Sequence, residues 1–219
     1  MNIPEYNGNL RAHSVKLPEA IHQAKGIRIF GRLIRSLVFS TDIAVIRNCN
    51  ADAVIAVYPF TPQPVISNAL IMASDIPVFT GIGGGTTRGP RVINLAVDAE
   101  RQGAMGVVVN APTKNEVISR VRQRLEIPIV VTVLSENEDI EARLNSGATI
   151  LNVSAAARTP EVVRKIREKF PDAAIMATGG PTNESILETI EAGANAITFT
   201  PPSTAELFKE MMARYRESL

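Results

Sequence analysis

The chain has 219 residues, 45% of them hydrophobic, which is enough for one domain with a large core and leaves little room for a second. Its 23 Lys and Arg residues nearly balance 22 Asp and Glu residues, and a formal net charge of +1 excludes general attraction to nucleic acid or an anionic membrane. The single cysteine, Cys49, excludes an internal disulfide. No apolar run is long enough to span a membrane or follows a basic signal-peptide head, so we expect a cytosolic protein.

Residues 1–35 precede the first expected strand, and we interpret them as an N-terminal cap segment. Within this segment, residues 17–24 place a proline at the start of a short apolar stretch, which predicts a short helix. We expect this helix to cover one end of the domain that follows.

Eight short apolar runs follow, and helical periodicity separates most of them. Between the first two runs, residues 41–50 leave space for only a turn or two of helix. Three of the helical stretches are followed by a glycine, Gly103, Gly147 or Gly193, the expected residue where a helix turns into the next strand. The runs begin near Ser36, Ala53, Ile76, Ala104, Ile127, Ala148, Ala173 and Ala196.

The runs are continuous rather than alternating, as in Val107-Val108-Val109, which is typical of parallel strands covered on both faces. Eight such strands with helical crossovers predict an α/β protein with a closed (β/α)8 barrel over residues 36–219. An open, doubly wound sheet is the alternative, but it would leave two buried-looking strands at its edges. We therefore expect the barrel, in one domain.

Chemistry in (β/α)8 barrels lies at the carboxyl ends of the strands, so the residues that follow each run are candidates. Gly179 and Gly180 follow the seventh run and precede a helix start, where free backbone N–H groups and the helix dipole converge. Thr200 follows the eighth run, and Ser203 is the expected N-cap of the last helix. We expect these four residues to bind a phosphate.

A second unusual loop follows the third run, where residues 80–90 contain five glycines. Gly84 and Gly85 let the backbone approach a ligand or move as a lid, and Arg88 would then close over an anion. The alternative is a flexible connection. The glycine spacing of a dinucleotide-binding motif is not met and the lysine of a P-loop is missing, so we expect no cofactor.

Three charged residues just past strand ends are candidates for proton transfer. Asp42 follows the first run and suits a general base or a helix N-cap equally well. Lys114, in the fourth loop, would neutralise a phosphate or carboxylate, although the first turn of a capped helix is the favoured interpretation. Glu136 is first a helix-start residue and second a general acid or base.

The other strand-end residues are rich in hydroxyls and amides and poor in charge, and no lysine or carboxylate is evident within a strand. We expect Asn110, Asn152 and Ser154 to contact the ligand.

The only histidines, His13 and His22, precede the first strand, which argues against a histidine-based triad. Together with Cys49 they do not have zinc-ligand spacing, so we expect no metal site. Cys49 is expected to be a buried structural thiol.

The strand followed by Thr178-Gly179-Gly180 and a helix, and then residues 192–197 and a second turn, resemble the phosphate-binding end of small aldolase-type and ribulose-phosphate-binding barrels. That group includes the 2-keto-3-deoxy-6-phosphogluconate aldolases, the N-acetylmannosamine-6-phosphate epimerases and the thiamine phosphate synthases. The resemblance implies phosphate ligation by backbone at Gly179, Gly180 and residues 200–203. It does not extend to catalytic residues, since no strand-embedded Schiff-base lysine with a partner glutamate is present.

Two hypotheses follow. In the first, the protein is a lyase or isomerase of a small phosphorylated metabolite, with Asp42, Lys114 or Glu136 moving a proton. In the second, it is a non-catalytic regulator that binds such a metabolite, similar to the glycerol-responsive antiterminator barrels. We also expect a symmetric homo-oligomer, most simply a dimer, because residues 64–72 keep an apolar exposed face.

Overall fold

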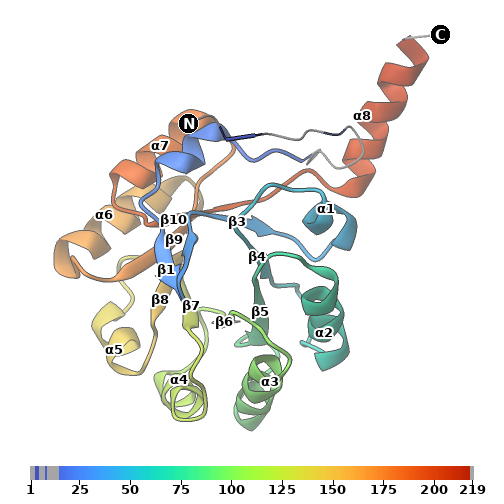
Figure 1. Ribbon diagram of the computed structural model, residues 1–219. Coiled ribbons are helices and arrows are strands. Elements are labelled where there is room, and N and C mark those ends of the chain that lie inside the picture. The colour runs from blue at the N-terminus through green and yellow to red at the C-terminus, as the bar shows by residue number, and fades with distance from the viewer. Residues whose placement is uncertain (1–2, 5–7, 9–14, 218–219) are drawn as a thin grey trace.

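The computed structural model describes residues 3–4, 8 and 15–217, so His13 lies outside the described residues. Eight parallel strands close into a barrel in which each pairs with its neighbour in the chain and the last pairs with the first. The predicted (β/α)8 barrel is confirmed (Figure 1). The strands are β3 (Ser36–Phe39), β4 (Ala53–Ala56), β5 (Val78–Gly83), β6 (Gly106–Val109), β7 (Ile129–Val133), β8 (Ile150–Val153), β9 (Ala174–Thr178) and β10 (Ala196–Phe199).

The helices form a ring around the strands, as Figure 1 shows. The first crossover is short, as expected, because α1 has five residues. No described helix is both long enough and apolar enough to cross a membrane. The helices are α1 (Ile43–Arg47), α2 (Pro64–Ala73), α3 (Pro90–Arg101), α4 (Asn115–Arg122), α5 (Ile140–Asn145), the 3-10 turn η2 (Ala156–Arg158), α6 (Thr159–Lys169), α7 (Asn183–Glu191) and α8 (Thr204–Glu217).

Side chains alternate between two apolar layers, as they must on pleated strands. The outer layer lies between the strands and the helices, whereas the inner layer fills the barrel lumen. Gly106 makes room for the largest lumen residue, since a Cβ there would lie 2.6 Å from Cδ1 of Phe79. The large side chains that pack together in the inner layer are Leu37, Ile55, Phe79, Val108, Val130, Ile150 and Met176.

A β-hairpin that the sequence did not predict closes the amino-terminal end of the barrel. Strands β1 (Ile27–Ile29) and β2 (Arg32–Ile34) pair antiparallel, and Ile29 and Ile34 pack with the lumen residues. The predicted helix in residues 17–24 is instead a short 3-10 helix, η1 (Glu19–Gln23), that contacts α7. The hairpin, rather than this helix, covers the barrel bottom (Figure 1).

The helix ends follow the sequence closely. Gly103, Gly147 and Gly193 all have positive φ, between 91° and 113°. In each case the next residue donates its N–H to a carbonyl five residues back, as Ala104 does to Ala99 over 3.0 Å. These are three copies of one helix-ending motif, the Schellman motif. Cys49 is buried as expected, and burial raises the pKa of its thiol.

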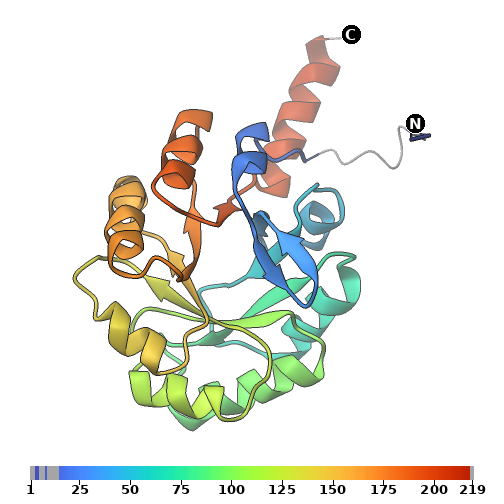
Figure 2. The same ribbon diagram turned by 60° about the vertical axis from the view of Figure 1, so that its left-hand side comes forward.

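Helix α8 does not join the ring. It projects away from the barrel in both views (Figures 1 and 2), and none of its described residues is buried. Phe208, Met211 and Met212 are 62%, 48% and 42% exposed. Their spacing of three and four residues places them on one face of the helix.

Candidate functional site

The carboxyl-end layer of the lumen is polar and uncharged on the side of β7 to β10. Thr132, Asn152, Thr178 and Thr198 each lie two residues beyond an apolar residue of the inner layer, so their side chains face the same lumen. The Oγ1 of Thr178 lies 3.4 Å from the Oγ of Ser154, within a hydrogen bond. The result is an arc of hydroxyl and amide groups along four neighbouring strands, above an apolar floor.

Two of these groups are buried without a partner. Asn152 is 8% and Thr198 is 5% exposed, and within the described chain neither the Oδ1 of Asn152 nor the Oγ1 of Thr198 has a hydrogen bond. A buried polar atom left unpaired costs about 1–3 kcal/mol, and most such atoms in proteins are paired. The lumen therefore has two polar groups that suit a ligand or an ordered water.

A small pocket of about 80 Å³ opens over one side of this mouth. Its walls come from the loops after β4, β5 and β6, and they include Tyr58, Gly83, Gly85 and Asn110. Asn110 is held by its main chain, because its N–H donates to the carbonyl of Gly83 over 3.0 Å. Of the sequence candidates, Asn110 and Gly85 line this pocket, whereas Asn152 and Ser154 lie at the carboxyl end of β8 and do not line it.

Asp42 is the N-cap of α1. Its Oδ1 accepts from the backbone N–H groups of Ala44 and Val45, over 2.8 and 3.3 Å, and its Oδ2 accepts from the hydroxyl of Thr204. The hydrogen bond from Thr204, and then those from the backbone, lower the pKa of Asp42. The sequence left open whether Asp42 is a helix cap or a general base. These contacts show that it caps α1, and its lowered pKa makes it a weak base.

In the loop after β9, several backbone N–H groups that the sequence suggested for a phosphate already have partners within the protein. The N–H of Gly179 donates to the carbonyl of Thr198 over 3.3 Å, and a Cβ at Gly179 would lie 2.6 Å from the Cγ2 of Ile197. Gly180 has a φ of 78°. At the start of α7, Thr182 and Ser185 form a capping box that uses the N–H groups of both residues. Among the described residues of this loop, the N–H groups of Gly180 and Asn183 are left for an anion.

The eighth loop carries a capping box of its own. The hydroxyl of Ser203 donates to Oε2 of Glu206 over 2.7 Å, and the N–H of Ser203 donates to the same oxygen over 2.8 Å. Ser203 is therefore the N-cap that the sequence predicted, and a carboxylate already lies at this helix start. Thr200 is exposed.

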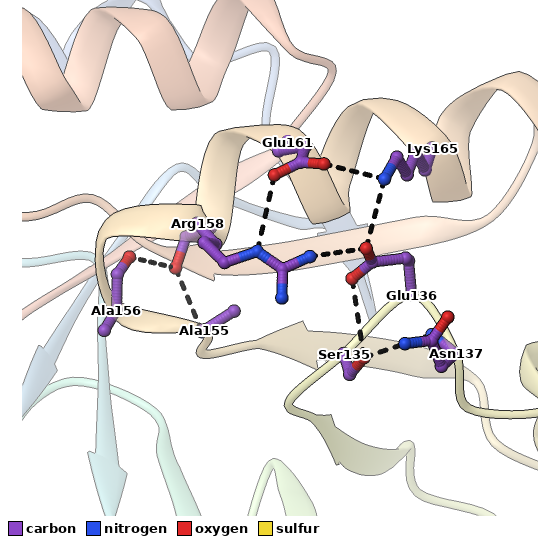
Figure 3. A network of polar contacts seen from close by, with 9 residues as sticks. Ser135, Glu136, Asn137, Ala155, Ala156, Arg158, Glu161 and Lys165 are labelled. Atoms are coloured by element: carbon purple, nitrogen blue, oxygen red, sulfur yellow. Dashed lines mark hydrogen bonds and ion pairs between the residues drawn. The ribbon is translucent and has the colours of Figure 1, made fainter.

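Glu136 belongs to an ion-pair network between the loop after β7 and the start of α6 (Figure 3). It pairs with Arg158 and, over 3.1 Å, with Lys165, and both cations also pair with Glu161. A hydrogen bond from its own backbone N–H, and then the contact with Lys165, lower the pKa of Glu136 to about 2. This carboxylate stays ionised and is tied to two cations.

Arg88 and Lys114 lie together outside the lumen, although 26 positions separate them in the chain. Both line a pocket of about 400 Å³ between the starts of α3 and α4, and Gly84 contributes to its wall. Arg88 also donates from Nε to the carbonyl of Gly85 over 2.8 Å. The structure thereby brings together a proposed lid residue and a proposed proton-transfer residue.

The sequence reasoning missed two buried threonines beside this loop. Thr87 and Thr113 are both 5% exposed, and among the described residues neither hydroxyl has a hydrogen-bond partner. Both lie in polar loops, where a single sequence contains no signal of burial. Within the described chain, no group of three or more His, Cys, Asp or Glu side chains is placed to hold a metal.

No family model and no curated protein sequence matches this chain. Among solved structures, it is similar to a candidate phosphonomutase from Burkholderia cenocepacia J2315, with a TM-score of 0.64 and 17% identity over 91% of this chain and 96% of the other. A phosphoenolpyruvate phosphomutase from Streptomyces platensis subsp. rosaceus gives 0.63 and 12%, over 90% and 83%. A dihydrodipicolinate synthase from Agrobacterium tumefaciens gives 0.57 and 15%, over 83% and 71%.

These neighbours are aldolase-type barrels, which agrees with the general resemblance drawn from the sequence. They differ from the three families that the sequence resembles, the phosphogluconate aldolases, the epimerases and the thiamine phosphate synthases. At such low identities the likeness establishes the (β/α)8 fold.

Proposed function

We propose that this protein is a cytosolic lyase or mutase-type isomerase that acts on a small phosphorylated metabolite in the carboxyl end of the barrel lumen. The observation that carries this proposal is the pair of buried, unpartnered oxygens on Asn152 and Thr198. A pocket that leaves polar groups unpaired gains their full hydrogen-bond energy when a ligand arrives. The solved neighbours, whose names describe two mutases and a synthase, support the reaction class.

The polar groups of the lumen are neutral donors and acceptors of hydrogen bonds, and none of them carries a charge. The side-chain N–H groups of Asn152 and the hydroxyls of Thr132, Thr178 and Thr198 line one side of the mouth, where they would stabilise negative charge that develops on a carbonyl or phosphoryl oxygen. The unpartnered Oδ1 of Asn152 can only accept, so it would pair with a hydroxyl or amide group of the ligand. Asp42 is our candidate for moving a proton, because its carboxylate follows β3 at the carboxyl end of the barrel. Glu136 lies equally close to the end of β7, but two cations hold it.

The second candidate function is a regulator that binds a phosphorylated metabolite without turnover. The lack of a charged side chain among the polar residues of the lumen favours it, because lyases and isomerases commonly use a buried acid or base. The two functions share the site and differ only in product formation.

The test is a panel of small phosphorylated and phosphonate metabolites and 2-keto acids, read by thermal shift and by mass spectrometry of products. A thermal shift with a new product supports the enzyme, whereas a shift without product identifies the regulator. Protein that neither shifts nor forms product with any compound excludes both functions for this panel.

The variants Asn152→Leu and Thr198→Val assign the effect to the lumen. Each should weaken ligand binding about tenfold or more, because one hydrogen bond in a buried site is lost. The matched control is Thr80→Val: Thr80 is 1% exposed and its hydroxyl is also unpartnered, but it lies on the outer side of β5 with Val78 and Ile82. Equal loss in Thr80→Val would reject the lumen as the site.

We also propose that the protein acts as a homo-oligomer, most simply a dimer. A helix of 14 residues is marginal in water when it stands alone, and α8 buries none of its described residues. Phe60, Val65 and Met72, around α2, are 74%, 69% and 79% exposed and offer further apolar surface. A second copy of the chain would cover both surfaces at once.

A further inference from the structure

The pocket between α3 and α4 has the features of an anion site in its own right. It lies on the far side of the loop after β5 from the lumen, and its two charged lining residues, Arg88 and Lys114, are both cations. Both side chains are exposed at the rim. The floor is formed by Val92, Pro112 and Val117.

Two helices begin at this pocket, and neither has a side-chain cap. The N-cap residue of α3 is Gly89, which has no side chain, and that of α4 is Lys114, which has no acceptor. These helices have 12 and 8 residues. In α3, Pro90 has no N–H and the N–H of Val92 donates to the carbonyl of Gly89, so the N–H of Arg91 is left for another acceptor. In α4 the N–H groups of Asn115 and Glu116 are left. The positive ends of two helix dipoles add to the two side-chain cations.

A buried hydroxyl adds an independent sign of a ligand. Thr113 lines the pocket, is 5% exposed and has no hydrogen-bond partner for its Oγ1 within the described chain. The hydroxyl faces Gly84, where a Cβ would collide with it, so only a glycine lets the loop lie over this residue. An unpaired buried hydroxyl is costly and is normally satisfied by a partner.

The α4 side of the pocket is held in place by Arg143. Its guanidinium donates to the carbonyl of Ala111 over 2.6 Å, to the Oδ1 of Asn115 over 3.0 Å and to the carbonyl of Thr113. The three contacts fix the loop that precedes α4. The site is thus formed before any ligand binds, which lowers the entropic cost of binding.

The seventh loop provides a useful comparison. A pocket of about 440 Å³ beside Gly179 and Gly180 has Glu188 as its charged lining residue, and the capping box of α7 already uses backbone N–H groups there. An anion would meet a carboxylate at that position and two cations between α3 and α4. Electrostatics therefore favour the α3–α4 pocket.

We propose that the α3–α4 pocket binds an oxyanion, a phosphate or carboxylate group, that carries a small apolar body. The oxyanion would contact Arg88, Lys114 and the helix N–H groups, and the apolar body would lie against Val92 and Val117. The site stands outside the lumen and does not depend on the reaction proposed above.

The test is a titration of the whole protein with inorganic phosphate at constant ionic strength, followed by amide NMR shifts. We expect saturable shifts at Gly89, Arg91, Asn115 and Glu116. Phenyl phosphate, which adds an apolar body, should bind more tightly than inorganic phosphate. Saturable shifts only at residues 180–185 or 203–206 would overturn the proposal in favour of the seventh and eighth loops, and no saturable shift at all would overturn it outright.

Charge-removing variants provide the control. Arg88→Gln and Lys114→Gln should each weaken phosphate binding about tenfold, the expected loss for a hydrogen bond to a charged group. Arg91→Gln removes the same charge one turn away, from an exposed side chain that does not line this pocket, and should leave binding nearly unchanged. If Arg91→Gln weakens binding as much as the other two, general surface charge, and not this pocket, attracts the anion.

Discussion

The carboxyl group of Glu136 connects the loop after β7 to η2 and α6 through ion pairs and hydrogen bonds. The pKa of Glu136 in the folded protein is about 2, below its ordinary value of 4.5. The contribution of this carboxylate to stability is therefore complete above pH 4.5 and is lost as the pH falls toward 2. The cations that hold it, Arg158 and Lys165, come from η2 and α6. Acid should therefore loosen the contact between the loop after β7 and α6.

We predict that Glu136→Gln reduces the loss of stability between pH 4.5 and pH 2. The urea midpoint of the wild type should fall more steeply over this range than that of the variant, because the variant has no carboxylate to protonate. Glu141→Gln, on the exposed surface of α5, controls for the removal of a negative charge. Parallel pH profiles of wild type and Glu136→Gln would show that this network does not contribute to stability.

Two neighbouring glycines in the loop after β5 allow a matched comparison. Gly84 has a φ of 107°, and a Cβ there would lie 2.9 Å from the N atom of Asn110 and closer still to the hydroxyl of Thr113. Gly85 meets nothing within 4 Å. The two positions have the same residue type and opposite surroundings.

We predict that Gly84→Ala lowers the free energy of unfolding by about 1–3 kcal/mol, from backbone strain and from the collision with Thr113. Gly85→Ala should be neutral within about 0.5 kcal/mol, because nothing opposes the added methyl group. Urea denaturation measures both. An undiminished stability in Gly84→Ala would mean that the loop readily takes another position.

At the scale of elements, the sequence predicted what local patterns encode. The eight strands begin within two residues of their expected positions, and Gly103, Gly147 and Gly193 end helices as expected. Both signals are local: an apolar run buried on two faces, and a residue that tolerates positive φ.

The β1–β2 hairpin was not predictable in the same way. Its strands have three residues each, and its turn consists of Phe30 and Gly31, both with positive φ. Two-residue hairpin turns are usually recognised in a sequence by Asn or Asp before Gly, and a phenylalanine in that position does not predict a turn. Only the fit of Ile29 and Ile34 into the barrel bottom makes the hairpin favourable.

The candidate site was predictable in position and less so in detail. The sequence placed it at the carboxyl ends of the strands, but the choice between capping and catalysis at Asp42 depends on Thr204, 162 positions away. The convergence of Arg88 with Lys114 likewise depends on how two neighbouring loops lie. Tertiary contacts of this kind leave no trace in residue spacing.

At the scale of the whole molecule, α8 is where association can be tested. We predict that the wild type is a dimer by light scattering at micromolar concentration, and that Phe208→Glu shifts it to the monomer. A buried phenylalanine contributes about 1.5–3 kcal/mol, and a symmetric interface loses it twice, so the dimer should weaken about 100-fold or more.

Ala213→Glu adds the same charge on another face of α8, where Ala213 is exposed, and should leave the dimer intact. A monomeric wild type, or equal dissociation by both variants, would remove α8 from the interface.

The N-terminal hairpin also determines the order in which the molecule can be completed during synthesis. The backbone N–H of Gly26 donates to the carbonyl of Asn195 over 2.7 Å, and β3 pairs with β10, so both segments find these partners only after β10 has been synthesised. Until β10 is added, Ile29 and Ile34 can pack only against part of the lumen. The nascent chain then has an open sheet that is exposed to water and has two unpaired edges. The barrel can close only after β10 has been synthesised, and a truncated chain that lacks β10 would keep an exposed strand edge where aggregation can start.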